Sequence, residues 1–258
     1  MIPALSELWQ ACFGDDTEYI QFFMEHRFRP EDTLVWLEGG KPIGVTYVLP
    51  CSIDGCFARY GYAAGVLPSY RRHGIGSLMV QDVVAACRKE SSLFFGTPLA
   101  GLEEYYHRLG SIDAFYRRTE QLQPEGPAHS LNIADVSPGL YTQLRNETFE
   151  GAGFVCWDLE AVTYALAEQS ISGGFSHVLT WEGRQYLLFG RCGQGSLQLL
   201  ETTLSPDLFR LLAPSLCSYY HVSQVIGHFP DVPGPDSRPH GCCWKKLSPS
   251  GWFGLDLT

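Results

Sequence analysis

The spacing of apolar and polar residues along the first half of the chain predicts alternating helices and strands. Apolar residues repeat at the period of an amphipathic helix in four segments, and short apolar runs bounded by turn residues lie between them. The expected helices are residues 4–12, 17–27, 77–87 and 102–109. The expected strands are residues 33–37, 42–49, 58–67, 93–95 and 114–121.

The second half repeats this order of elements. Two prolines and a glycine in residues 123–127 mark the expected boundary between two domains, 1–122 and 128–258. The helices expected after it are residues 138–149, 159–169 and 206–216, and the strands are residues 177–181, 185–191, 196–203, 222–229 and 241–247. The order helix, helix, three strands, helix, strand therefore appears once in each half, which favours one α/β fold used twice.

Composition narrows the class of protein. Hydrophobic residues make up 45% of the 258 positions and charged residues 18%, so a packed core is expected. The net charge of -10 argues against a nucleic-acid partner, which would need a basic surface. No apolar run approaches a membrane span or a signal peptide, and the nine scattered cysteines form no CxxC pair, so we expect a cytoplasmic protein with reduced thiols.

The segment between the third expected strand and the helix after it carries the chemistry. Arg71, Gly74 and Gly76 have the spacing R-x-x-G-x-G. The start of a helix offers unpaired N–H groups and a partial positive charge, and glycines let phosphate oxygens approach the backbone. Arginines add charge-assisted hydrogen bonds. The segment is thus predicted to bind a pyrophosphate.

Two other interpretations stay open at this point. The spacing alone occurs by chance in roughly one chain in fifteen of this length, so the glycines could serve only a strand-to-helix turn. A dinucleotide-binding loop would want a glycine where Arg71 stands and an acidic residue at a strand end about 20 residues on. Glu90 has that distance but belongs to the end of a helix.

The stretch from Val66 to Gly76 resembles the coenzyme-A signature of the GNAT acetyltransferase superfamily. Tyr105 to Gly110 is similar to its second signature, with Ser111 in place of the usual aromatic residue. The resemblance covers about residues 1–122 and implies a mixed, mostly antiparallel twisted sheet flanked by helices. The whole chain resembles the enhanced-intracellular-survival type, in which a catalytic GNAT domain is followed by a degenerate one. Trp157–Val162 is similar to the start of that second domain.

The resemblance implies a role for particular residues. Acetyl-CoA would be held by Ala64, Val66, Arg71, Arg72, His73, Gly74, Ile75, Gly76 and Ser77. A backbone N–H near Val66 would stabilise the oxyanion, and Tyr106 would protonate the departing thiolate. The general base is left open among Glu103, Glu104, His107 and water.

The expected reaction is direct transfer of an acetyl group from acetyl-CoA to a primary amine on a small molecule or a side chain. The alternative is a non-catalytic acyl-CoA-binding sensor or interaction module. Ser205-Pro206-Asp207 stands where the second half would need a phosphate loop, so that half is expected to shape the acceptor site without binding cofactor. The identity of the acceptor, the use of other acyl groups, the place of the C-terminus and a homo-oligomeric state are left open.

No metal site is expected. The second half contains residue types that bind zinc, but their spacing fits no standard finger or ribbon. These residues are Cys217, His221, His228, His240, Cys242 and Cys243.

Overall fold

The computed structural model of the chain describes residues 2–151, 153–248 and 251–255. It contains two compact units. Of the described residues, the first unit contains residues 2–114 together with a returning segment, His240–Leu247, and the second unit contains residues 115–151, 153–239, 248 and 251–255. No helix in the described part of the chain is long and apolar enough to cross a membrane.

The first unit is a five-stranded sheet with helices on both faces. The strands lie in the order β1-β2-β3-β4-β12 and are antiparallel except for the parallel pair β3–β4. The strands are β1 (Thr33–Glu38), β2 (Lys41–Ile53), β3 (Cys56–Val66), β4 (Leu93–Gly96) and β12 (Ser237–Cys243). The helices are α1 (Ile2–Phe13), α2 (Thr17–His26), α3 (Ile75–Lys89) and α4 (Glu103–Arg108), with short 3₁₀ turns η1 (Pro30–Asp32) and η2 (Pro68–Tyr70).

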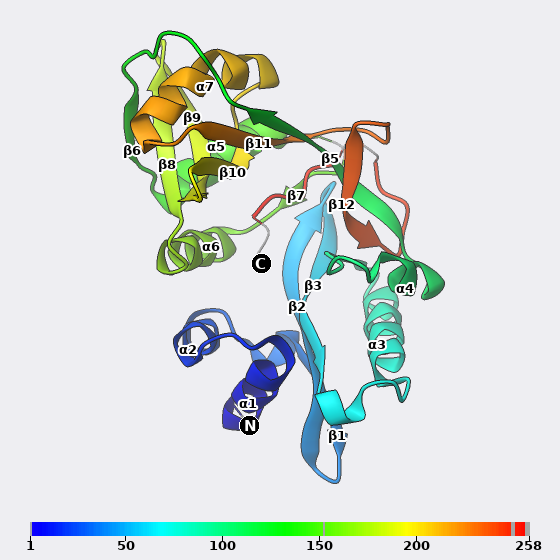
Figure 1. Ribbon diagram of the computed structural model, residues 1–258. Coiled ribbons are helices and arrows are strands. Elements are labelled where there is room, and N and C mark those ends of the chain that lie inside the picture. Colours follow the sequence, from blue (N-terminus) through cyan, green and yellow to red (C-terminus); the bar gives the residue numbers. More distant parts are fainter. Residues whose placement is uncertain (1, 152, 249–250, 256–258) are drawn as a thin grey trace. The chain divides into compact units, whose positions relative to one another are not determined.

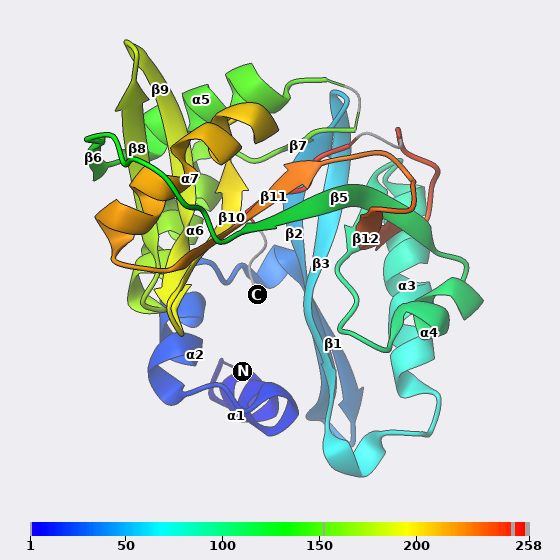
Figure 2. The ribbon, with the colours of Figure 1, turned by 45° about the horizontal axis from the view of Figure 1, so that its top comes forward.

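The two faces of this sheet carry different cores. α1 and α2 lie on one side of β2 and β3, and α3 and α4 lie on the other (Figure 1, Figure 2). On the first side Trp9 and Phe23 pack on Tyr47, with ring centroids 5.4 and 4.7 Å away. On the other side Val83 of α3 packs with Val48 of β2. Tyr47 and Val48 point to opposite faces because side chains alternate along a strand.

The second unit has six strands in the order β5-β11-β10-β9-β8-β6. The strands are β5 (Ile112–Leu122), β6 (Asn132–Asp135), β8 (Phe175–Trp181), β9 (Arg184–Gly193), β10 (Ser196–Thr202) and β11 (Gln224–Pro230). A short strand β7 (Val155–Cys156) and the helices α5 (Pro138–Phe149), α6 (Leu159–Ile171) and α7 (Pro206–Tyr220) complete it. β10 and β11 are parallel, as β3 and β4 are in the first unit.

The expected repeat of elements is confirmed. α1, α2, β1, β2, β3, α3 and β4 in the first unit correspond in order to α5, α6, β8, β9, β10, α7 and β11 in the second. Both halves therefore have the same order of α/β elements, as the sequence pattern indicated. In the second unit the buried face of α7, which includes Phe209, Leu212 and Leu216, packs on Leu188 and Leu197 of the sheet.

A buried polar network ties the end of the described chain into the second unit. The Glu201 carboxylate accepts hydrogen bonds from Arg145 Nε at 3.0 Å, from the Tyr141 hydroxyl at 2.6 Å and from the Trp252 indole N–H at 2.8 Å. Arg145 also donates to the carbonyls of Val155 and Phe253, each at 2.7 Å. Since the buried charges are paired and bonded, the network holds residues 251–255 in place.

The structure divides the chain differently from the expected 1–122 and 128–258. β5 continues across residue 114 and pairs with β11 from Val225–Leu122 to Pro230–Arg117, so residues 115–127 join the second unit. The segment expected at 241–247 starts earlier, as β12, and pairs with β4 through Cys242–Gly96 and Cys243–Phe95. Hydrophobic periodicity identifies a strand but not its partner, so this return to the first unit was not predicted. The short strands β6 and β7 were also not predicted.

Candidate active site

A cavity opens in the first unit where two parallel strands part. The pairing of β3 with β4 ends at Gly61 and Gly96, whereas β3 runs on to Val66. Between Tyr62 and Gly65, β3 has one residue more than the part of β2 that pairs with it. Ala63, in this stretch, has a φ of 47°. This bulge bends β3 away from β4. The cavity between them has a volume of about 420 Å³.

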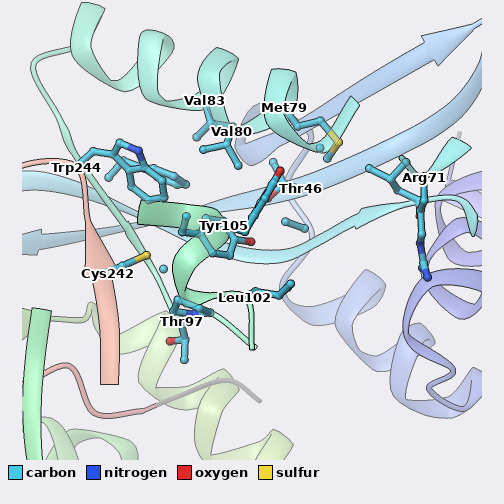
Figure 3. A pocket seen from close by; sticks show the side chains of 18 of the residues that line it. Thr46, Arg71, Met79, Val80, Val83, Thr97, Leu102, Tyr105, Cys242 and Trp244 are labelled. Atoms are coloured by element: carbon cyan, nitrogen blue, oxygen red, sulfur yellow. The ribbon is translucent and has the colours of Figure 1, made fainter. Parts of the chain in front are cut away.

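Residues of β2, β3, β4, α3, α4, the connecting loops and the returning segment line this cavity, and most of the lining is apolar (Figure 3). β3 contributes Ala64 and Val66, and α3 contributes Met79, Val80 and Val83. The segment after β4, the helix α4 and the returning segment complete the wall. An apolar slot of this kind suits a flexible chain with few charges, such as the pantetheine arm of coenzyme A.

The helix α3 begins at the mouth of the cavity with its first turn uncapped. Arg72 and Gly74, the residue that precedes the helix, have φ values of 66° and 81°. Gly74 makes no side-chain cap, and the first helical hydrogen bond runs from Leu78 N–H to the Gly74 carbonyl at 3.1 Å. The N–H groups of residues 74–77 are therefore available for an anion, with the positive end of the helix dipole behind them.

Four other helices do not share this feature. α2, α5, α6 and α7 each begin with a side-chain oxygen that accepts a hydrogen bond from an N–H group of the first turn. These capping residues are Asp16, Ser137, Asp158 and Ser205. The open N-terminus of α3 is consistent with a site for phosphate rather than with an ordinary helix start.

Arg71 serves the loop itself in this structure. Its Nε donates to the Val66 carbonyl at 2.9 Å, and Nη2 donates to the Cys12 carbonyl at the end of α1 at 3.4 Å. In Figure 3 the side chain runs away from the other lining residues, toward α1. Arg71 thus fastens the loop to the strand before it.

The backbone of β3 presents donors to the cavity. Leu67 N–H donates to the Ile43 carbonyl of β2 at 2.9 Å. Because N–H groups alternate in direction along a strand, the Val66 N–H points away from β2, to the side that β4 has left. The N–H group of Ala64, two residues before Val66, points to the same side. These are the two residues of β3 that were predicted to contact acetyl-CoA.

The two adjacent tyrosines of α4 occupy different surroundings. The Tyr105 hydroxyl lies 3.4 Å from that of Ser77 in the first turn of α3. A Cβ at Gly76 would lie 3.1 Å from the Tyr105 hydroxyl, so the glycine makes room for the phenol. Tyr106 packs into the core beneath α3, and burial raises its pKa to about 12. Both tyrosines line the cavity, so the choice of Tyr106 as the acid remains a prediction.

Two further polar groups of the cavity wall were not found by sequence reasoning. The Thr97 hydroxyl is buried and has no hydrogen-bond partner within the described ranges, although Thr97 lines the cavity. Cys242, of β12, lines it as well, and burial raises the pKa of its thiol to about 12, against the opposing effect of the nearby Ser111 hydroxyl. The pairing of the strands brings these two residues to the site, and no local sequence motif indicates either of them.

The candidate bases lie elsewhere. His107 Nε2 is 2.8 Å from Asp113, Glu103 accepts the Gly101 N–H at 2.8 Å, and Glu104 lies 3.9 Å from Arg108. All three side chains are exposed, and they are not among the residues that line the cavity. Of the other predicted residues, Arg71, Arg72 and Gly76 line it, whereas His73, Gly74, Ile75 and Ser77 surround the helix start.

Comparisons with known proteins agree with this geometry. The model of the acetyltransferase (GNAT) family matches residues 2–110. Among solved structures, a GCN5-related N-acetyltransferase from Anabaena variabilis is 12% identical with a TM-score of 0.69, and the match covers 94% of this chain and 69% of that one. A probable N-acyltransferase from Enterococcus faecalis is 15% identical with a TM-score of 0.67 and the same two coverages.

Eis1 from Mycobacterium abscessus is 14% identical with a TM-score of 0.62, and the match covers 87% of this chain and 62% of that one. At these identities the likeness establishes the fold. A comparison with curated protein sequences gave no match. Residues 2–110, less than half of the chain, match the GNAT family model, and the similarity to Eis1 supports the resemblance to the enhanced-intracellular-survival type at the level of fold.

Proposed function

We propose that this protein transfers an acetyl group from acetyl-CoA to a primary amine. One observation supports the proposal most. The uncapped start of α3, with Arg72 and Gly74 in left-handed conformations, stands at the mouth of the apolar cavity in the splay of β3 and β4. The free N–H groups of the helix start suit the pyrophosphate of acetyl-CoA, and the apolar cavity beside them suits its uncharged thioester arm.

Each step of the transfer would use groups of the first unit. The neutral amine nitrogen attacks the thioester carbon, the C–S bond breaks, the nitrogen gives up one proton to water or to a base, and the thiolate takes one. The N–H of Val66 would stabilise the oxygen of the thioester, and the Tyr106 hydroxyl would donate the proton. Since the pKa of Tyr106 is raised to about 12, the phenol keeps its proton at neutral pH and can give it only to a base generated beside it.

The second unit has features that argue against a cofactor site of its own. At the start of α7 the Ser205 hydroxyl already accepts the Leu208 N–H, and Asp207 places a negative charge in the first turn. Phe209 packs against Gly227 of β11, where an added Cβ would lie 3.0 Å from its ring. We therefore assign coenzyme A to the first unit alone.

Acetyl-CoA binding is tested by calorimetry on Gly74→Glu. The variant places a carboxylate where the pyrophosphate is expected, and affinity should fall at least a hundredfold. Gly55→Glu is the matched control. Its φ of 71° is close to the 81° of Gly74, neither glycine has a neighbour within 4 Å of an added Cβ, and Gly55 precedes β3 whereas Gly74 follows the opposite end of that strand. Unchanged affinity in a folded Gly74→Glu protein would falsify the assignment of the loop.

Turnover is tested by thiol release with a panel of amines that includes polyamines, aminoglycosides and lysine derivatives. We expect coenzyme A to appear stoichiometrically with acetylated amine for at least one of them. Tight acetyl-CoA binding without thiol release across the panel would instead support a non-catalytic acyl-CoA-binding module. Absence of binding by the wild-type protein contradicts both.

A further inference from the structure

We propose that Trp244, on the returning segment, is a positioning residue for Tyr106, so that the segment His240–Leu247 is part of the active site of the first unit. This inference rests on the proposed function, in which Tyr106 donates a proton. It assigns a role to a residue more than a hundred positions beyond the GNAT signatures.

Trp244 joins α4 to β4. Its indole N–H donates to the Leu109 carbonyl, at the C-terminal end of α4, at 3.0 Å. Its backbone N–H donates to the Phe94 carbonyl of β4 at 3.2 Å. The indole ring lies 4.9 Å from the Phe94 ring, and it meets the Tyr106 ring edge-on at 6.1 Å and 83°. One side chain thus contacts both the end of the helix and the ring of Tyr106.

The helix α4 needs such a contact. It has six residues, and its N-cap residue Leu102 makes no side-chain hydrogen bond. A helix this short is unstable by itself, so tertiary contacts must set its orientation. Within the described residues, the other hydrogen bonds and ion pairs of α4 side chains are the 3.4 Å approach of Tyr105 to Ser77 and the exposed contacts His107–Asp113, Glu103–Gly101 and Glu104–Arg108. Trp244 is the half-buried residue that joins α4 to β4.

The position of the Tyr106 hydroxyl depends on this tether more than on any bond of its own. The hydroxyl has no hydrogen-bond partner among the residues that the structure describes, so only the packing of its ring aims it. Phe94 and Trp244 provide that packing in the core cluster. Loss of the indole N–H would let α4 shift, and a displacement of about 1 Å at a reacting group costs up to a hundredfold in rate.

The test is a double-mutant cycle on the full chain with Trp244→Phe and Tyr106→Phe. Trp244→Phe keeps an aromatic ring and removes the indole donor. We expect kcat to fall about tenfold with KM for acetyl-CoA unchanged within about twofold. In the Tyr106→Phe background the same substitution should leave kcat unchanged, because the hydroxyl that it positions is already absent.

Trp36→Phe is the matched control, since Trp36 packs in the same core cluster and donates its indole N–H to Asp82 at 3.0 Å. It should lower thermal stability to a similar degree without changing kcat. Equal effects of Trp244→Phe in both backgrounds would overturn the positioning role. If Trp244→Phe does not fold, Trp244→Tyr, which also keeps an aromatic ring and lacks the indole N–H, goes through the same cycle. An inactive wild-type protein would refute the proposed function first, whereas an active one with additive effects refutes only the role of Trp244.

Discussion

Tyr106→Phe and Tyr105→Phe together decide which phenol of α4 gives up a proton. Tyr106→Phe removes a hydroxyl that has no hydrogen-bond partner in the described part of the chain, so stability should be unchanged or slightly higher. A general acid contributes about 10²–10⁴-fold to turnover, which corresponds to about 3–5 kcal/mol at about 1.4 kcal/mol per decade. We expect kcat to fall by this factor while the affinity for acetyl-CoA stays within about twofold.

Tyr105→Phe should behave in the opposite way. Its hydroxyl lies at the first turn of α3, 3.4 Å from Ser77, where the loop would hold phosphate. Loss of one such hydrogen bond is worth about 1 kcal/mol, so we expect KM for acetyl-CoA to rise about fivefold with kcat nearly unchanged. Steady-state kinetics with one good amine measure both effects.

The pH profile gives an independent check. Burial raises the pKa of Tyr106 to about 12, so the phenol is protonated at all lower pH and its contribution is lost only as pH rises through that value. The wild-type kcat should therefore show no alkaline fall below about pH 11 from this group. A Tyr106→Phe protein with wild-type kcat, or a loss of kcat confined to Tyr105→Phe, would refute the assignment.

Three further predictions concern the cavity wall, the second unit and the returning segment. Thr97→Val should lower acetyl-CoA affinity about fivefold without loss of thermal stability, because the buried hydroxyl is free for a ligand; calorimetry and a melting curve test both parts. Arg145→Met leaves the Glu201 carboxylate buried without its counter-ion and should cost about 3–5 kcal/mol in urea unfolding, whereas Arg108→Met on the surface should cost little; equal losses would contradict this. A chain that ends at Gln123 lacks β12 and should aggregate or fail to bind acetyl-CoA; a soluble, fully active fragment would show that the returning segment is dispensable.

The phosphate loop was readable because all of its determinants are local. Arg71, Gly74 and Gly76 lie within six positions, between a strand and a helix that periodicity alone predicts. The structure adds that Arg71 bonds to its own strand, which spacing could not indicate. The choice between Tyr105 and Tyr106 was only partly readable from the sequence. The motif position favours Tyr106, but both side chains line the cavity.

The sequence by itself determined the class of fold, the order of the repeated elements in both halves and the place of the uncapped helix start that we propose binds a phosphate. These follow from side-chain periods of 2 and 3.6 residues and from glycine and cap positions, all of which act over a few neighbouring residues. Only the tertiary structure decided that β12 returns to pair with β4 and carries Cys242 and Trp244 to the cavity. The hydrophobic pattern of one strand does not specify which strand it pairs with, because every exposed sheet edge offers the same N–H and C=O groups. Which edge is taken depends on packing among residues far apart in the chain.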